Sequence, residues 1–184
     1  MSGEPRIGRL AGQVPRIHPK AWVAPGAVVV GSVSIGAGSS IWYGSVLRAD
    51  DAAIEIGSAC NVQDLCCVHV DAGEPAVIED RVSIGHHATV HGARIGSGAL
   101  IGIGAIVLGR ASVGPDALVA AGTVVLPGVR VPAGVLYAGV PGRVVRELTE
   151  ADRDLFAGTP ERYLARARRH RAVHWDAQET ASAD

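Results

Sequence analysis

Histidines are the residues of this sequence most suited to chemistry. The stretch IGHHATVHG, residues 84–92, holds three of the seven in the chain, and His69 stands upstream in VHVDAG. Imidazole nitrogens bind zinc and also act as general bases near neutral pH. Whether they do either depends on which side chains the fold brings together. The three remaining histidines stand apart in the sequence and are interpreted as ordinary surface residues: His18, His170 and His174.

A six-residue period must position these side chains. From residue 95 to residue 136 the chain reads IGSGAL, IGIGAI, VLGRAS, VGPDAL, VAAGTV, VLPGVR, VPAGVL, and the same register begins at Val23 and at Ile56. Each line starts with a branched aliphatic residue, which a disordered glycine-rich linker would not maintain. The fifth residue of a line is small or β-branched: Val33, Ser39, Ser45, Ala99, Ala105, Ala111, Ala117, Thr123, Val129 and Val135. The pattern predicts an all-β fold, a parallel β-helix in which three lines form one triangular coil.

Interruptions of the period carry most of the polar candidates: LRADDAAIEI, HVDAGEPA and HGAR. Val68 and Val90 begin lines one coil apart, so the residues that follow them, His69 and His91, should stack on one outer face. Their separation should be close to one strand spacing, ~4.8 Å, which suits two imidazoles that share a metal ion. His86 falls on the adjacent face and should point away. We therefore expect the third ligand to be His86 of a neighbouring chain in a trimer.

Composition excludes several classes of function. The formal net charge of -1 gives no general attraction to nucleic acid or to an anionic membrane. No stretch approaches the ~20 apolar residues of a membrane span, and the first residues do not resemble a signal peptide. Three cysteines do not form a disulfide framework. We expect a cytoplasmic protein with reduced thiols.

Helix signals follow the point near Pro141 where the repeat ends. Thr149 and Asp152 form a capping-box pattern, and Thr159 precedes Pro160 as a second expected N-cap. The predicted organisation is a β-helix domain over 1–148, a C-terminal α-helical segment over 149–172 and a flexible tail over 173–184. Four apolar residues of the helical segment are expected to lie against the coil or a partner chain: Leu155, Phe156, Tyr163 and Leu164.

The motifs VLRADD, NVQD, VHVDAG and IGHHATVHG, in this order on a hexapeptide repeat, resemble those of the γ-class carbonic anhydrases. The resemblance covers roughly residues 17–148 and implies a left-handed coil and a homotrimer. It also implies a zinc ion, with Fe²⁺ or Co²⁺ as alternatives, at the subunit interface. The implied activity is reversible hydration of CO₂ to bicarbonate by a metal-bound hydroxide. The implied ligands are His69, His86 and His91.

Further site residues follow from the same resemblance. It implies that Gln63 holds the metal-bound hydroxide, and that Arg48, Asp50 and Asp64 form a polar network at the subunit boundary. We expect both carboxylates to pair with Arg48, and an interfacial salt bridge without a catalytic role remains open for them. Tyr163 matches a tyrosine that faces the metal pocket.

Two departures from the family pattern leave other functions open. The segment between the first two histidines lacks the long acidic loop with its proton-shuttling glutamate, for which Asp51, Asp71, Glu74 and His87 are possible substitutes. Arg162 stands where an asparagine is usual. Cys67, which should face outward near the histidines, is interpreted as non-ligating. The alternatives are an acyl-CoA transferase with a histidine base, a thioesterase, and a catalytically silent trimeric scaffold subunit.

Overall fold

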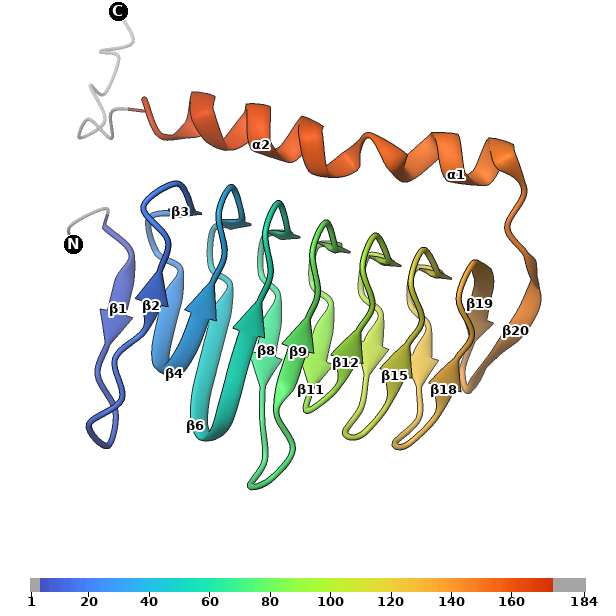
Figure 1. The fold of residues 1–184 in the computed structure, drawn as a ribbon, viewed down its shortest axis with the longest axis horizontal. Helices are drawn as coiled ribbons and strands as arrows, with labels where there is room; N and C mark the ends of the chain where they lie inside the picture. Colours follow the sequence, from blue (N-terminus) through green and yellow to red (C-terminus); the bar gives the residue numbers. More distant parts are fainter. Residues whose placement is uncertain (1–3, 174–184) are drawn as a thin grey trace, which may run out of the picture.

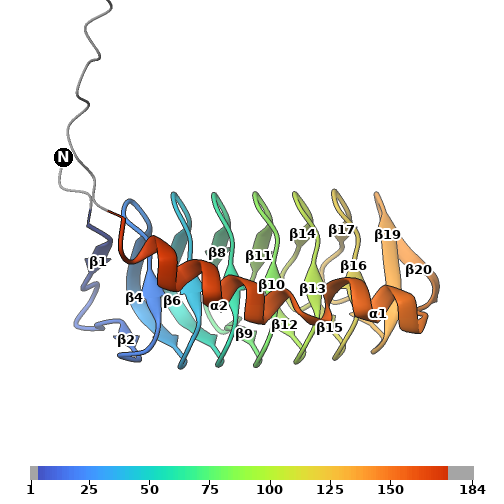
Figure 2. The ribbon, with the colours of Figure 1, turned by 90° about the horizontal axis from the view of Figure 1, so that it is seen from above.

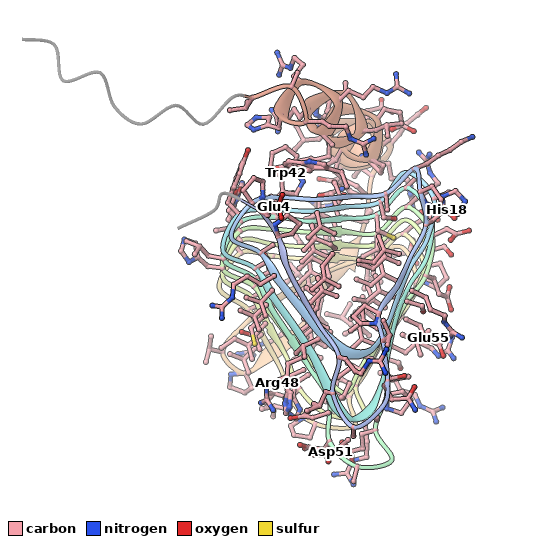
Figure 3. All side chains as sticks on the ribbon, turned by 90° about the vertical axis from the view of Figure 1, so that its left-hand side faces the viewer. Glu4, His18, Trp42, Arg48, Asp51 and Glu55 are labelled. Atoms are coloured by element: carbon pink, nitrogen blue, oxygen red, sulfur yellow. The ribbon has the colours of Figure 1, made fainter. Side chains whose placement is uncertain are left out.

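The chain forms a left-handed parallel β-helix of hexapeptide repeats with an α-helical segment at its C-terminal end (Figure 1). The computed structural model describes residues 4–173. A view along the stack of coils shows a triangular outline with the helices lying on one side (Figure 3). The all-β architecture predicted from the six-residue period is therefore confirmed.

Each side of the triangle is a parallel sheet that receives one strand from each coil. The first side, here called the histidine face, contains the first part of β4 (Val28–Ile35) and of β6 (Val46–Ile56) together with β1 (Arg6–Gly8), β8 (Cys67–His69), β11 (Thr89–His91), β14 (Ile106–Val107) and β17 (Val124–Val125). The second face contains the later part of β4 and of β6 with β2 (Arg16–Ile17), β9 (Ala76–Ile78), β12 (Arg94–Ile95), β15 (Ser112–Val113) and β18 (Arg130–Val131).

The third face lies under the helices (Figure 2). It contains β3 (Trp22–Val23), β5 (Ser40–Ile41), β7 (Asn61–Val62), β10 (Ser83–Ile84), β13 (Leu100–Ile101), β16 (Leu118–Val119) and β19 (Val135–Gly139). The last strand, β20 (Gly142–Glu147), pairs antiparallel with β19 and ends the sheet.

The first interruption of the repeat lies at the corner between the histidine face and the second face. Strands β4 (Val28–Ile35) and β6 (Val46–Ile56) both run through this corner. Gly31 pairs with Ala49 and Val33 pairs with Ile54, so the residues between Ala49 and Ile54 bulge outward, and Asp51 lies at this vertex (Figure 3). Gly31 has φ of 84°, and a Cβ there would overlap the Ala49 carbonyl. Only glycine fits this close approach.

Branched aliphatic side chains fill the narrow interior in columns. On the histidine face the buried column runs through every coil: Val29, Leu47, Val68, Val90, Val107 and Val125. The small residues expected at the fifth positions are also buried, except Val129, which is half-buried. Ser45 shows how a hydroxyl is tolerated there, since it donates to the Gln63 carbonyl at 2.6 Å and accepts from the Cys66 amide at 3.2 Å.

Two helices follow the coils, and their caps match the sequence only in part. Helix α1 (Glu150–Ala157) begins with the predicted capping box of Thr149 and Asp152. Helix α2 (Thr159–His170) has Gly158 as its N-cap, so the predicted cap at Thr159 is wrong. The Thr159 hydroxyl instead accepts a hydrogen bond from Arg162. The expected packing of Leu155 is not seen within one chain, since its side chain is 78% exposed.

An aromatic cluster attaches α2 to the third face. Tyr163 and Ala167 pack on Trp22 and Trp42, with the Tyr163 and Trp42 rings edge to face at 5.2 Å. His170 lies one helical turn further on, half-buried, 4.9 Å from the Trp42 ring. Its Nδ1 lies 2.8 Å from the Tyr43 hydroxyl. The interpretation of His170 as an ordinary surface residue is therefore wrong, because this imidazole packs between helix α2 and the aromatic side chains of Trp42 and Tyr43.

Other expectations concern location and organisation. None of the helices among residues 4–173 combines the length and apolar character needed to cross a bilayer. A cytoplasmic location stays a prediction, as does the division of the chain into domains at residue 148. His174 and nearly all of the predicted flexible tail lie outside the described residues. His18 is exposed, as expected, and its Nδ1 accepts from the Lys20 amide.

Candidate metal centre

The two stacked histidines lie side by side on the histidine face. Strand register places Arg48, His69 and His91 in one column, each on a neighbouring strand. The His69 and His91 rings are 5.0 Å apart between centroids, and His69 Nδ1 faces His91 Nε2 at 3.0 Å. Their side chains keep 16% and 29% of their exposure, respectively. Coil stacking alone thus brings two ring nitrogens to one point on the surface.

Carboxylates surround this histidine pair. Asp50 Oδ1 lies 2.9 Å from His69 Nε2, and its other oxygen accepts from the Arg48 guanidinium. Desolvation raises the pKa of Asp50, but hydrogen bonds from its own backbone and from His69 outweigh it, so the pKa is lowered. Asp71 Oδ1 lies 3.7 Å from His91 Nε2. One ligand atom from each of His69, Asp71 and His91 falls within 4.8 Å of the others.

His86 lies elsewhere, at the corner between the third face and the histidine face. Its Nδ1 is 2.9 Å from Asp64 Oδ2, and its Nε2 is 3.3 Å from the Tyr163 hydroxyl. His86 is not part of the group formed by His69, Asp71 and His91. Within residues 4–173 the ion-pair partner of Asp64 is His86, and the pairing of Asp64 with Arg48 at the subunit boundary stays a prediction.

Tyr163 reaches this corner from helix α2. The ring is buried against Trp42, and the Arg166 guanidinium lies 4.9 Å from its centroid. Burial raises the pKa of Tyr163, with the charge of Arg166 opposing this effect. The phenol therefore stays protonated at neutral pH and retains an O–H donor beside His86.

The remaining candidates differ in how deeply their side chains are buried. Gln63 is buried beside Asp64 in the sequence, and its amide donates to Asn61 Oδ1 at 2.9 Å. His87 is exposed at a corner position with φ of 59°. Cys67 is exposed, whereas burial raises the pKa of the neighbouring Cys66 thiol to about 12. Cys66 is thus a protonated core residue at neutral pH.

Apolar side chains lie exposed around both groups of histidines. Leu65 and Ile103 flank His86 at the corner and are 55% and 56% exposed. Ile106, 36% exposed, pairs with the strand of His91 on the histidine face. Exposed apolar side chains that gather around polar groups are typical of a surface covered by another protein.

The donor set fits a zinc ion. Neutral imidazoles are preferred zinc ligands, and metal-bound histidines usually have their second nitrogen bonded to a carboxylate. Asp64 does this for His86, because a proton on Nδ1 leaves the Nε2 lone pair available. Asp50 lies in the corresponding position beside His69. One chain offers a pair and a single histidine on separate surfaces, so a three-histidine centre needs two chains.

Known proteins share both the sequence and the fold. A protein-family sequence model described as "Bacterial transferase hexapeptide (six repeats)" matches residues 15–49. A probable carbonic anhydrase of Methanocaldococcus jannaschii is 48% identical over 130 residues, which are 71% of this chain and 82% of that protein. Gamma carbonic anhydrase 1, mitochondrial, of Arabidopsis thaliana is 39% identical over 87% of this chain and 60% of its own length. The chain belongs to the γ-carbonic-anhydrase family.

A solved structure agrees with the family's fold and carries a different name. A putative acetyltransferase of Bacillus cereus superimposes with a TM-score of 0.91 at 34% identity, covering 94% of this chain and all of that one. The fold of this chain is thus shared with a protein described as a putative acetyltransferase.

Two contacts of this γ-carbonic-anhydrase-family chain were not predicted. Asp71 was considered only as a proton acceptor, although it stands two residues after His69 and so emerges on the same side of an extended strand. His170 stands three residues after Ala167 and seven after Tyr163, which places it on the same buried stripe of α2. Both spacings were visible in the sequence.

Proposed function

We propose that this chain catalyses reversible hydration of CO₂ to bicarbonate at a divalent metal ion shared between neighbouring chains of a homotrimer. The observation that carries the proposal is the pair of ring nitrogens of His69 and His91, which face one another at 3.0 Å on the outer side of the histidine face. Family membership supports the reaction, and the geometry supports the metal.

The trimer follows from the division of the site. His69 and His91 lie on the histidine face, and His86 lies at the next corner, so one chain can donate two ligands and its neighbour the third. Repeating this head-to-tail contact closes a ring when the rotation between subunits allows it. The exposed Leu65 and Ile103 flank the same corner and would be covered by that contact.

Zinc is the ion we favour, with Fe²⁺ or Co²⁺ compatible with the same donors, and it would be held by His69, His91 and the neighbour's His86. An ion with three neutral imidazole ligands lowers the pKa of a coordinated water from ~16 to ~7, which supplies hydroxide at neutral pH.

The chain's own polar residues would orient the reactants. Asp50 and Asp64 hold the imidazoles of His69 and His86 in one tautomer through the 2.9 Å contacts. The Gln63 amide supplies a buried hydrogen-bonding group beside Asp64, and the Tyr163 O–H is a donor beside His86. Arg48 balances the charge of Asp50. Proton release would use exposed acceptors on the rim, such as Asp71, whose Oδ1 lies 3.7 Å from His91 Nε2.

Metal content and CO₂ hydration test the proposal together. Protein purified without chelator or affinity-tag metal should contain about one metal ion per chain and should accelerate hydration in a stopped-flow assay. His69→Ala, His86→Ala and His91→Ala should each lose the metal, whereas His18→Ala should keep it. Metal-free wild-type protein would refute the site, and full metal content without hydration would refute the reaction alone.

Acyl transfer or thioester hydrolysis is the second candidate, favoured by the putative acetyltransferase with the same fold. A transferase with a histidine base would need no metal, and a thioesterase could use the same metal centre. Release of CoA from a short acyl-CoA, measured with and without chelator, separates these reactions from hydration. Activity that survives metal removal would identify the transferase.

A further inference from the structure

A groove beneath helix α2 lies on the opposite side of the third face from His86. It runs between α2 and the corner that joins the third face to the second face, and it encloses a cavity of about 510 Å³. Small-molecule sites typically measure about 300–1,000 Å³. The walls are apolar, with Trp22 and Ala37 from the coils and Leu164 from the helix. We call this cavity the α2 groove.

Positive charge lines this groove without an opposing carboxylate. Lys20, Arg168 and Arg171 all contribute to the lining, and no acidic residue among those described does so. Other arginines of the chain have acidic partners, such as Arg81 with Glu161 at 2.7 Å. Arg171 donates to the Ala21 carbonyl at 2.9 Å, which holds its side chain at the groove and leaves the charge unbalanced. Like charges gathered around an apolar cavity attract a counter-ion.

The position of the groove leaves it open in the proposed trimer. The histidine centre uses the histidine face and the corner of Asp64 and His86, whereas the groove lies at the corner formed by residues 18–20, 36–38 and 57–59. The two corners are at opposite edges of the third face (Figure 3), where His18 labels the groove side. The groove is thus separate from the site of hydration.

We propose that the α2 groove binds a small amphiphilic organic phosphate. The apolar part of this ligand lies against Trp22 and Leu164, and the phosphate group lies at Lys20, Arg168 and Arg171. A phosphate monoester carries a charge of about -1.5 to -2 at pH 7. Guanidinium groups pair with phosphate through two parallel hydrogen bonds, so this group satisfies three cations better than a single carboxylate does.

Calorimetric titration of the full-length chain with octyl phosphate tests the proposal, with octanol and inorganic phosphate as matched partial probes. Octyl phosphate should bind saturably and more tightly than either partial probe, because only it uses both the wall and the cations. Arg168→Gln and Lys20→Gln should each weaken binding about fivefold. Ala37→Leu should also weaken it, by filling the cavity without a change of charge.

Arg130→Gln is the control, since it removes the same charge from β18 on the second face. It should leave the affinity for octyl phosphate unchanged. Equal weakening by Arg130→Gln, or equal binding of inorganic phosphate alone, would reduce the effect to general electrostatics and overturn the proposal. Absence of saturable binding, as expected if another segment or a second copy of the chain filled the groove, would overturn it as well.

Discussion

The coils over residues 46–92 and the coils over residues 95–136 share one core and differ on their outer surface. Buried Val and Ile occupy the inward positions in both regions. On the histidine face the outward position after the buried aliphatic residue holds Arg48, His69 and His91 in the first region and the half-buried, apolar Leu108 on the next coil. Outward side chains barely touch the core, so a coil can gain or lose chemistry without disturbing the packing of its neighbours.

Mixing two inactive variants gives the largest expected effect on this comparison. His69→Ala and His86→Ala should each lack metal and activity as pure trimers. If each centre takes ligands from two chains, random co-assembly in equal amounts should restore about one quarter of the wild-type centres. Metal analysis and CO₂ hydration after joint refolding measure this recovery.

The control for this mixture is His69→Ala with His91→Ala. Both variants damage the same half of the centre, so co-assembly restores no intact pair and activity should stay at background. Recovery in this control, or none in the first mixture, would show that the centre is not divided between chains as proposed.

A charge at the exposed corner of the coils over residues 46–92 should have the next largest effect. Leu65→Glu places a carboxylate where the proposed interface covers a side chain that is 55% exposed in one chain. We expect the trimer to dissociate and the metal to be lost, while the circular dichroism of the coils is unchanged. Light scattering coupled to gel filtration measures the mass. Leu155→Glu, on α1, should remain trimeric and metal-bound.

Removing the Tyr163 hydroxyl should have a moderate effect. Tyr163→Phe keeps the ring against Trp42 and removes the O–H that lies 3.3 Å from His86 Nε2. In the proposed centre the metal takes the Nε2 lone pair, which leaves this O–H to donate to the reactants; one such hydrogen bond is worth about 1 kcal/mol, so hydration should slow about fivefold while metal content is retained. Unchanged kinetics would limit Tyr163 to packing.

The smallest effects contrast two hydroxyls in the core. Ser45, immediately before the coils over residues 46–92, has both hydrogen-bond partners, whereas the buried Thr123 hydroxyl, in the coils over residues 95–136, has no partner among the described residues. Ser45→Ala should lower the free energy of unfolding by about 2 kcal/mol, and Thr123→Val should raise it by about 1 kcal/mol. Denaturant titration measures both, and a destabilised Thr123→Val variant would contradict the assignment.

The coils could be predicted from the sequence because each coil repeats the same six-residue pattern of inward-facing residues. A six-residue period, repeated from Val23 to Leu136, fixes which residues face inward and which strands become neighbours. The stacking of His69 on His91 follows from that register and is seen at 5.0 Å. The start of α2 was not predictable in the same way, because Thr159 and Gly158 are both acceptable caps and only the path of the chain decides between them.

The site was less predictable wherever it depends on contacts between elements far apart in sequence. The resemblance implies that Asp64 joins Arg48 in a network at the subunit boundary, but it did not predict the 2.9 Å contact of Asp64 with His86 within one chain. This contact of Asp64 depends on how neighbouring coils meet at a corner, which no local sequence pattern specifies. The contact of Tyr163 with His86 joins residues 77 positions apart and requires α2 to return along the coils. The metal roles of His69, His86 and His91 remain predictions.

That return of α2 gives the molecule an unusual order of completion. Ribosomes deliver the first coils early, yet Trp22 and Trp42 acquire their cover only when Tyr163 and Ala167 arrive. Arg171 then joins Ala21 across 150 positions of sequence. Coils can stack one after another as they are synthesised. The tryptophans of the first coils nevertheless stay exposed to water until α2, the last helix, packs on them.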